Sequence, residues 1–221
     1  MIRQAIIPLA GLGTRLLPLT SVFPKELLPI HGKPGIEYIL DECIEAGIKE
    51  VIFIISNKKK LIKKYFTNCQ LLKKTIKKKK DKRLLNYYNK ILKYNKMIKF
   101  VYQNQPKGTG DAVLKTKNLI KDNYFLMLLP DDLILKKNCS KDMISLHKKK
   151  NCSVMASMLV NKKTVNRWGI YSKGKKIDKS NFYIEDVIEK PDLKLAPSRC
   201  AVIGRYILPK KIFYKLRNQK K

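Results

Sequence analysis

Near its amino terminus the chain reads IIPLAGLGTRLLPLTSVFPKELLP over residues 6–29, and the rest of the fold is organised around this stretch. An apolar run typical of a buried strand breaks abruptly into a loop that contains Gly11 and Gly13. Because glycine has no Cβ, a phosphate or a base can approach this loop closely, and its N–H groups can turn toward an anion. Arg15 and Lys25 add two fixed cations. We therefore expect a nucleotide or phosphate site directly after the first strand.

Two familiar glycine motifs do not fit this loop. A Walker loop requires Gly-x-x-x-x-Gly-Lys-Ser/Thr, and a dinucleotide fingerprint requires a third glycine where this chain has Leu16. Two glycines after a strand also occur in ordinary tight turns, so Gly-x-Gly alone leaves that alternative open. Other groups along the chain must therefore decide between a ligand site and a tight turn.

The residues after the loop alternate between helical and strand patterns. From Gly35 onward, apolar residues recur at the spacing of an amphipathic helix, and Gly47 is a typical helix end. Residues 50–56 form a near-continuous apolar run, as in a strand that is buried on both faces. Strand, loop, helix and strand in this order make a βαβ unit, which favours a parallel sheet.

The same patterns predict the later elements, namely strands at 99–102, 123–129, 153–160, 167–172, 182–189 and 201–208 and helices through 113–117, over 140–149 and from 209 to 216. Residues 57–95 are rich in lysine, and we expect two or three amphipathic helices there with a frayed join near 77–82. The predicted fold class is α/β, a doubly wound and mostly parallel sheet with a helical insertion at 57–95 and extra strands. Because no linker divides the chain, residues 1–221 are expected to form a single domain.

The chain is strongly basic. Its 49 basic and 17 acidic residues give a net charge of +32, an excess that is typical of nucleic-acid-binding proteins. The excess is nearly all lysine, however, and it accompanies abundant isoleucine, asparagine and tyrosine, as an AT-rich coding sequence would produce. No aromatic-plus-glycine RNA-binding signature is present, so we expect no specific nucleic-acid partner. The lysine runs at 58–60 and 77–80 are expected on solvated helix faces.

The cysteines and histidines exclude other classes of protein. The five cysteines are scattered without Cys-x-x-Cys spacing, and neither His31 nor His147 lies near a cysteine at metal-ligand spacing. We therefore expect neither a disulfide framework nor a zinc site. The longest apolar runs, such as residues 124–130, are much shorter than a membrane span, so we expect no membrane partner and a cytoplasmic protein.

Three further groups of polar residues follow predicted strands, at the edge where open α/β sheets bind ligands. Gln103 offers both a donor and an acceptor to the edge of a pyrimidine, and Gly108 lets the backbone close over the base. Asp131 and Asp132 are carboxylates of the kind that Mg²⁺ takes from proteins, together with water and substrate oxygens.

Glu189 and Lys190 form the third group. A carboxylate can accept hydrogen bonds from two sugar hydroxyls, and a neighbouring lysine can hold a sugar phosphate. In isolation each group also has an ordinary structural alternative: a surface loop for Gln103, a turn or helix cap for Asp131, and an exposed strand end for Glu189.

The longer string Gly-x-Gly-Thr-Arg-Leu-x-Pro-x-Thr-x-x-x-Pro-Lys-Glu-Leu-Leu-Pro over residues 11–29 resembles the signature of the sugar-nucleotide pyrophosphorylases, and its Pro-Lys-Glu variant resembles the bacterial UTP–glucose-1-phosphate uridylyltransferases. The Gln–Gly pair, the paired aspartates, Trp168-Gly169-Ile170 and Glu189-Lys190-Pro191 follow in the family's order over nearly the whole chain. The resemblance implies a Rossmann-like nucleotidyltransferase that transfers a uridylyl group from UTP to glucose 1-phosphate. It also implies Mg²⁺ as cofactor and pyrophosphate as the second product.

The resemblance also assigns roles to individual residues. It implies charge stabilisation by Arg15, Lys25 and Lys190 and metal binding by Asp131. It implies substrate contacts by a larger set that follows the strands: Ala10, Gly11, Gly13, Thr14, Glu26, Gln103, Gly108, Asp132, Gly169 and Glu189. No protein nucleophile is required, because a phosphate oxygen of the sugar phosphate attacks the α-phosphorus of UTP in line.

The chain departs from the family pattern at three points. Asp111 stands where these enzymes usually have histidine, and Trp168 stands where they have tyrosine, which keeps the ring and loses the hydroxyl. Family members also continue beyond the position of Lys221, through a segment that supplies a second metal carboxylate and helices that help to assemble oligomers. We therefore expect a shortened chain with impaired metal binding, and a homo-oligomer weakened by the missing helices.

The sequence leaves three alternatives open. A thymidylyltransferase acting on dTTP and glucose 1-phosphate is one, although Pro24-Lys25-Glu26 and the insertion at 57–95 argue against it. An inactive, truncated remnant would bind UDP-glucose without turnover. A basic nucleic-acid-binding protein would show a sequence-dependent component of binding that resists salt.

Overall fold

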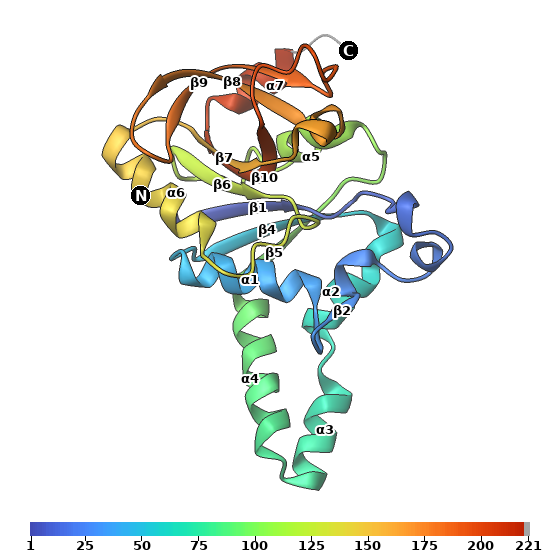
Figure 1. Cartoon of the computed structure of the whole chain (residues 1–221). Coiled ribbons are helices and arrows are strands. Elements are labelled where there is room, and N and C mark those ends of the chain that lie inside the picture. The colour runs from blue at the N-terminus through green and yellow to red at the C-terminus, as the bar shows by residue number, and fades with distance from the viewer. Residues whose placement is uncertain (219–221) are drawn as a thin grey trace.

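An eight-stranded sheet forms the centre of the molecule in the computed structural model, which describes residues 1–218 (Figure 1). The strand order is β5-β4-β1-β6-β10-β8-β9, and β7 also pairs with β10. The strands are β1 (Gln4–Pro8), β4 (Glu50–Ile55), β5 (Ile98–Tyr102), β6 (Tyr124–Leu128), β7 (Val154–Leu159), β8 (Gly169–Lys176), β9 (Phe182–Glu189) and β10 (Cys200–Pro209). A single domain over residues 1–221 stays a prediction, and Lys220-Lys221 lies outside the described residues.

The first half of the sheet is parallel. Strand β1 pairs in parallel with β4 and with β6, and β4 pairs in parallel with β5. Successive side chains of β4 point to opposite faces, so Ile52 and Ile54 enter one core while Val51 and Phe53 enter the other. All four are fully buried. This two-sided burial explains the near-continuous apolar runs of the sequence, as expected for parallel strands covered on both faces.

Helices cover both faces of the parallel strands. On one face α1 (Gly35–Glu45) and α6 (Cys139–Lys150) pack against the larger core, to which α1 contributes Ile36 and Leu40. On the other face α5 (Gly108–Leu114) and α7 (Ile212–Asn218) pack against the smaller core, where Phe213 stacks on Phe125. This arrangement confirms the predicted doubly wound α/β class.

The second half of the sheet is antiparallel. Strand β10 runs antiparallel to β6, β7 and β8, and β9 runs antiparallel to β8. These are the extra strands that the sequence predicts after residue 153, and β9 has the predicted bounds of 182–189. The pairing places Gly169 directly opposite Glu189.

The insertion between β4 and β5 forms three helices, α2 (Lys60–Thr67), α3 (Gln70–Lys79) and α4 (Lys82–Met97). Figure 1 shows α3 and α4 as a hairpin that projects away from the sheet. The predicted join near 77–82 is a turn at Lys80 and Asp81, where the Asp81 carboxylate accepts hydrogen bonds from two N–H groups of the first turn of α4. No residue of α3 is buried, whereas Ile91, Tyr94 and Met97 of α4 are.

The helix predicted through 113–117 ends earlier than expected, because α5 spans Gly108–Leu114 and leaves out Thr116 and Lys117. The hydroxyl of Thr116 donates to the carbonyl of Val113, and the N–H of Thr116 donates to the same carbonyl. A threonine side chain that binds nearby backbone in this way competes with helix continuation. Within residues 1–218, no helix combines the length and apolar character that crossing a membrane requires.

Candidate active site

The predicted site residues that follow the parallel strands gather at one edge of the sheet. Because β1, β4, β5 and β6 are neighbouring parallel strands, the loops that follow their carboxyl ends emerge at the same edge. The glycine loop follows Pro8 of β1, Gln103 follows Tyr102 of β5, and Asp131 lies shortly after Leu128 of β6. The topology therefore brings together groups that are far apart in the sequence.

The glycine loop leaves β1 and enters a short 3-10 helix over Thr14–Leu16. Gly13 has φ +69°, in the left-handed region, and a Cβ there would lie 3.2 Å from the Cγ2 of Thr20. The hydroxyl of Thr20 donates to the Gly13 carbonyl at 2.8 Å and holds the loop. By contrast, no atom lies within 4 Å of a Cβ built on Gly11. In this loop the conformation of Gly13 requires glycine, whereas Gly11 faces open space.

Two predicted cations belong to this loop region. The Nζ of Lys25 lies 3.3 Å from Oδ2 of Asp131, so it joins the segment after β1 to the segment after β6. The Asp131 side chain remains 58% exposed. Arg15 is exposed and has no ion pair within residues 1–218. Thr14 is also exposed, and Ala10 is half-buried.

Gln103 is buried at the end of β5, with 5% of the residue exposed. Its Nε2 donates to the carbonyl oxygen of Gly108 at 3.1 Å and to Oδ2 of Asp111 at 2.7 Å. Gly108 begins α5 with φ +85°, a conformation that favours glycine. The structure therefore brings the predicted pair of Gln103 and Gly108 into contact, and it adds Asp111.

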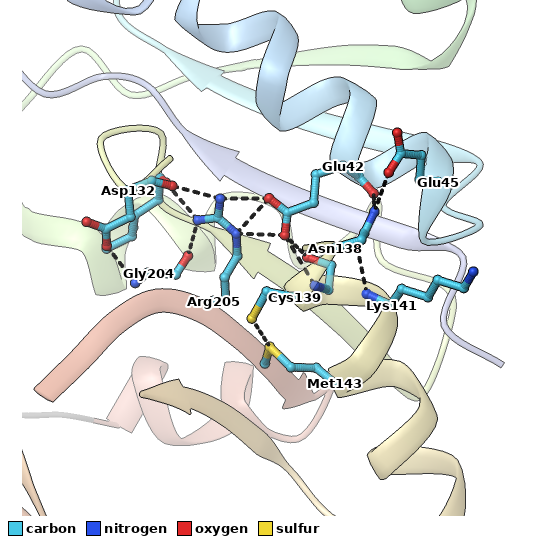
Figure 2. Close-up of polar contacts among 11 residues, drawn as sticks. Glu42, Glu45, Asp132, Asn138, Cys139, Lys141, Met143, Gly204 and Arg205 are labelled. Carbon is cyan, nitrogen blue, oxygen red and sulfur yellow. Dashed lines mark hydrogen bonds and ion pairs between the residues drawn. The ribbon is translucent and has the colours of Figure 1, made fainter. Parts of the chain in front are cut away.

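The segment that carries the paired aspartates is held by β10 (Figure 2). Oδ2 of Asp132 accepts a hydrogen bond from the N–H of Gly204 at 2.6 Å. A Cβ on Gly204 would lie 2.4 Å from the Cβ of Leu129 and 2.8 Å from the same Oδ2, so only glycine allows this approach. Asp132 thus has a clear structural contact, and its predicted role with substrate stays a prediction.

Arg205, the next residue of β10, holds the same segment through its guanidinium. It donates to the backbone carbonyls of Leu129 at 3.2 Å and Asp132 at 2.7 Å. Its charge is balanced by Glu42 of α1, with nitrogen to oxygen distances between 2.8 and 3.1 Å. Figure 2 shows Arg205 between Asp132 and Glu42, and both members of the ion pair are buried. The pair was not predicted, because 163 positions separate its members.

Glu189 and Lys190 lie at the end of β9, away from this network. Oε1 of Glu189 lies 3.6 Å from Nζ of Lys190, and both side chains are largely exposed. A Cβ on Gly169 would lie 3.0 Å from Oε2 of Glu189, so the glycine leaves room for that carboxylate. The structure therefore brings together Gly169, Glu189 and Lys190, which the sequence places on two strands.

Glu26 is buried, and its Oε1 lies 2.7 Å from Nζ of Lys59. The prediction that lysines 58–60 lie on a solvated face is wrong for Lys59, because this residue is 6% exposed and turns toward Glu26. Burial lowers the pKa of Lys59 despite the opposing charge of Glu26. Oε2 of Glu26 has no hydrogen-bond partner within residues 1–218.

A model of the nucleotidyl transferase family matches residues 4–221. The chain belongs to the nucleotidyl transferase family. The relatives include a Methanocaldococcus jannaschii protein that is 37% identical over 98% of this chain and 76% of its own length. The UTP–glucose-1-phosphate uridylyltransferase of Bacillus subtilis is 36% identical over 99% of this chain and 74% of its own length.

Solved nucleotidyl transferase structures agree with the fold. A UDP-glucose pyrophosphorylase complexed with UDP-glucose has a TM-score of 0.85 at 34% identity, over 100% of this chain and 81% of that chain. The UTP-bound enzyme from Acinetobacter baumannii has a TM-score of 0.91 at 34% identity, over 99% of this chain and 78% of that chain. A glucose-1-phosphate thymidylyltransferase structure from Bacillus anthracis is 20% identical with a TM-score of 0.71, which supports the fold alone.

Proposed function

We propose that this nucleotidyl transferase moves a uridylyl group from UTP to glucose 1-phosphate and releases pyrophosphate. The observation that carries the proposal is the contact of Lys25 with Asp131. It places a cation of the glycine loop beside an open carboxylate at the edge of the sheet where phosphates are expected. The names of the relatives at 34–37% identity supply the substrates.

The reaction is an in-line displacement at phosphorus. An oxygen of the sugar phosphate forms a bond to the α-phosphorus of UTP, and the bond from that phosphorus to its bridging oxygen breaks. The electron pair leaves with pyrophosphate, so no protein nucleophile is required. The contribution of the chain is to position the phosphates and to balance their charge with Arg15 and Lys25.

Gln103 follows β5 and Glu189 ends β9, at opposite ends of the strand order, so the base and the sugar would occupy opposite sides of the proposed site. The loop of Gly11 and Gly13 and the Gln103–Gly108 pair would receive the nucleotide. The exposed Glu189 would accept the sugar hydroxyls beside Gly169, and Lys190 would bind the sugar phosphate.

A divalent cation is part of this proposal, and we propose Mg²⁺. Within residues 1–218 no group of three or more potential metal-binding side chains occurs. Mg²⁺ needs no such group, because one or two carboxylates together with water and phosphate oxygens satisfy it. Asp131 fits this chemistry, since it is exposed and keeps one oxygen outside the Lys25 pair. When bound, the ion would offset charge on the phosphate oxygens.

The test is pyrophosphate release by the purified chain with UTP, glucose 1-phosphate and Mg²⁺, with dTTP in place of UTP as a control. We expect release that requires both substrates and favours UTP. Asp131→Asn should abolish most of it, whereas Asp142→Asn in the exposed first turn of α6 should not. A chain that binds UDP-glucose and melts cooperatively without turnover would refute the proposal in favour of an inactive remnant.

Two further expectations accompany this function. We propose a cytoplasmic location, which is consistent with the five free thiols of the chain and with nucleotide substrates. A homo-oligomer stays a prediction, which analytical ultracentrifugation would test.

A further inference from the structure

Asp111 lies in the first turn of α5 and contacts the amide of Gln103. Oδ2 of Asp111 accepts a hydrogen bond from Nε2 at 2.7 Å, and the carbonyl oxygen of Gly108 accepts a second one at 3.1 Å. These two contacts occupy the same end of a buried glutamine side chain. The departure from the family pattern at position 111 therefore has a defined partner.

The two contacts fix the orientation of the amide. A carboxylate oxygen and a backbone carbonyl oxygen can only accept hydrogen bonds, so the end of Gln103 that faces them must be the NH₂ group. Rotating the amide by half a turn would place Oε1 against two acceptors and would bring three acceptor oxygens together with no hydrogen between them. Oε1 is consequently the end that remains for another partner.

We propose that Asp111 is a positioning residue that holds the Gln103 amide with Oε1 toward the base, so that the site selects a pyrimidine that carries a proton on N3. This inference rests on the proposed function, in which Gln103 faces the base. Uracil and thymine have an N3–H that donates to Oε1. N3 of cytosine carries no hydrogen, so it would face Oε1 as a second acceptor and form no hydrogen bond. Gly108 begins α5, where an N–H has no intrahelical acceptor and can donate to a neighbouring base carbonyl.

The experiment compares UTP with CTP in the full chain and in Asp111→Asn. An asparagine keeps the size of the side chain, but its own amide can present either a donor or an acceptor, so only the Gly108 carbonyl still opposes rotation of the Gln103 amide. We expect the preference for UTP over CTP in kcat/KM and in binding to fall by about tenfold or more. We expect kcat at saturating UTP to stay within about twofold of the unchanged chain, because no reacting atom is touched.

Asp142→Asn is the matched control, since it makes the same chemical change at an exposed aspartate in the first turn of another helix and should leave the preference unaltered. Asp111→Glu keeps an acceptor-only side chain and should retain most of the preference. If Asp111→Asn turns over UTP and leaves the UTP:CTP ratio unchanged, the role of Asp111 is overturned while the proposed function stands.

Direct binding of UTP and CTP, measured by calorimetry, distinguishes a failure of the role of Asp111 from a failure of the proposed activity. A chain without turnover that still prefers UTP, and loses that preference in Asp111→Asn, would support the inference and refute the proposed activity. A chain that binds UTP and CTP equally well would overturn the inference. Thermal melting of each variant shows whether it is folded, and a folded Asp111→Ala variant gives a second test if Asp111→Asn does not fold.

Discussion

Removal of the negative charge of Glu42 should strongly destabilise the protein. In the structure, three hydrogen bonds of 2.8 to 3.1 Å join this carboxylate to the guanidinium of Arg205, whose side chain is fully buried. Glu42→Gln keeps the size of the side chain and leaves the arginine charge buried without a counter-ion. Breaking a buried pair in this way costs about 3–5 kcal/mol. Such a loss is a large part of the total stability of a domain, which is about 5–15 kcal/mol.

Urea-induced unfolding followed by circular dichroism measures this loss. The matched control is Arg83→Gln, which breaks the Arg83–Asp81 ion pair at the surface, where the arginine side chain is 90% exposed. An exposed pair contributes about 0–1 kcal/mol, so the control should unfold at nearly the original urea concentration. A loss below about 1 kcal/mol in Glu42→Gln would refute the reasoning.

A double variant tests whether the loss of stability comes from the unpaired charge of Arg205. Glu42→Leu combined with Arg205→Met removes both charges and should recover part of the stability, because the unpaired charge is gone while the buried N–H and hydroxyl of Ser140 lose their acceptor. It also removes the hydrogen bonds from Arg205 to the carbonyls of Leu129 and Asp132, so the aspartate segment loses its support. We therefore expect a stable protein with reduced turnover. A double variant as unstable as Glu42→Gln would indicate that packing, and not charge, caused the loss.

The remaining predictions concern three other positions. Gly204→Ala should lower the unfolding free energy by about 1–3 kcal/mol and reduce turnover, because its Cβ would overlap Leu129; unchanged urea unfolding would contradict this. Gly11→Ala should change the unfolding free energy by less than about 0.5 kcal/mol, because its surroundings are open, yet weaken UTP binding measured by calorimetry. Burial raises the pKa of Asp41, but hydrogen bonds from Lys33, Tyr94 and Lys90 outweigh burial and lower that pKa below 3.8. The stability that Asp41 contributes is therefore present above about pH 4 and lost below it, so urea unfolding of the unchanged chain and of Asp41→Asn should differ less at pH 3 than at pH 6.

The order of the elements could be predicted because it depends on local patterns. Apolar runs of strand length, such as residues 50–56, and the helical spacing after Gly35 are properties of neighbouring residues. The strand at 182–189 has its predicted bounds for the same reason. The edge at which the site lies follows from the predicted parallel strands, since their carboxyl ends meet there.

The contacts that hold the site could not be predicted in the same way. Lys59 stands in a run of three lysines, and nothing in that run distinguishes the one that turns inward to Glu26. Arg205 pairs with a glutamate on a helix far away in the sequence, and the pairing depends on how the fold brings α1 near β10. Such contacts follow from tertiary packing, which periodicity does not describe.

The projecting hairpin of α3 and α4 concentrates charge far from the sheet. Residues 70–97 contain eleven basic residues and one acidic residue, and α3 buries none of its side chains. Like charges at this spacing repel one another, and dissolved ions screen that repulsion over about 10 Å at 0.1 M ionic strength. Low ionic strength should therefore loosen the tip of the hairpin while the buried strands are unaffected. The ionic strength of the solution would then determine how far this basic arm stays ordered, independently of the chemistry at the edge of the sheet.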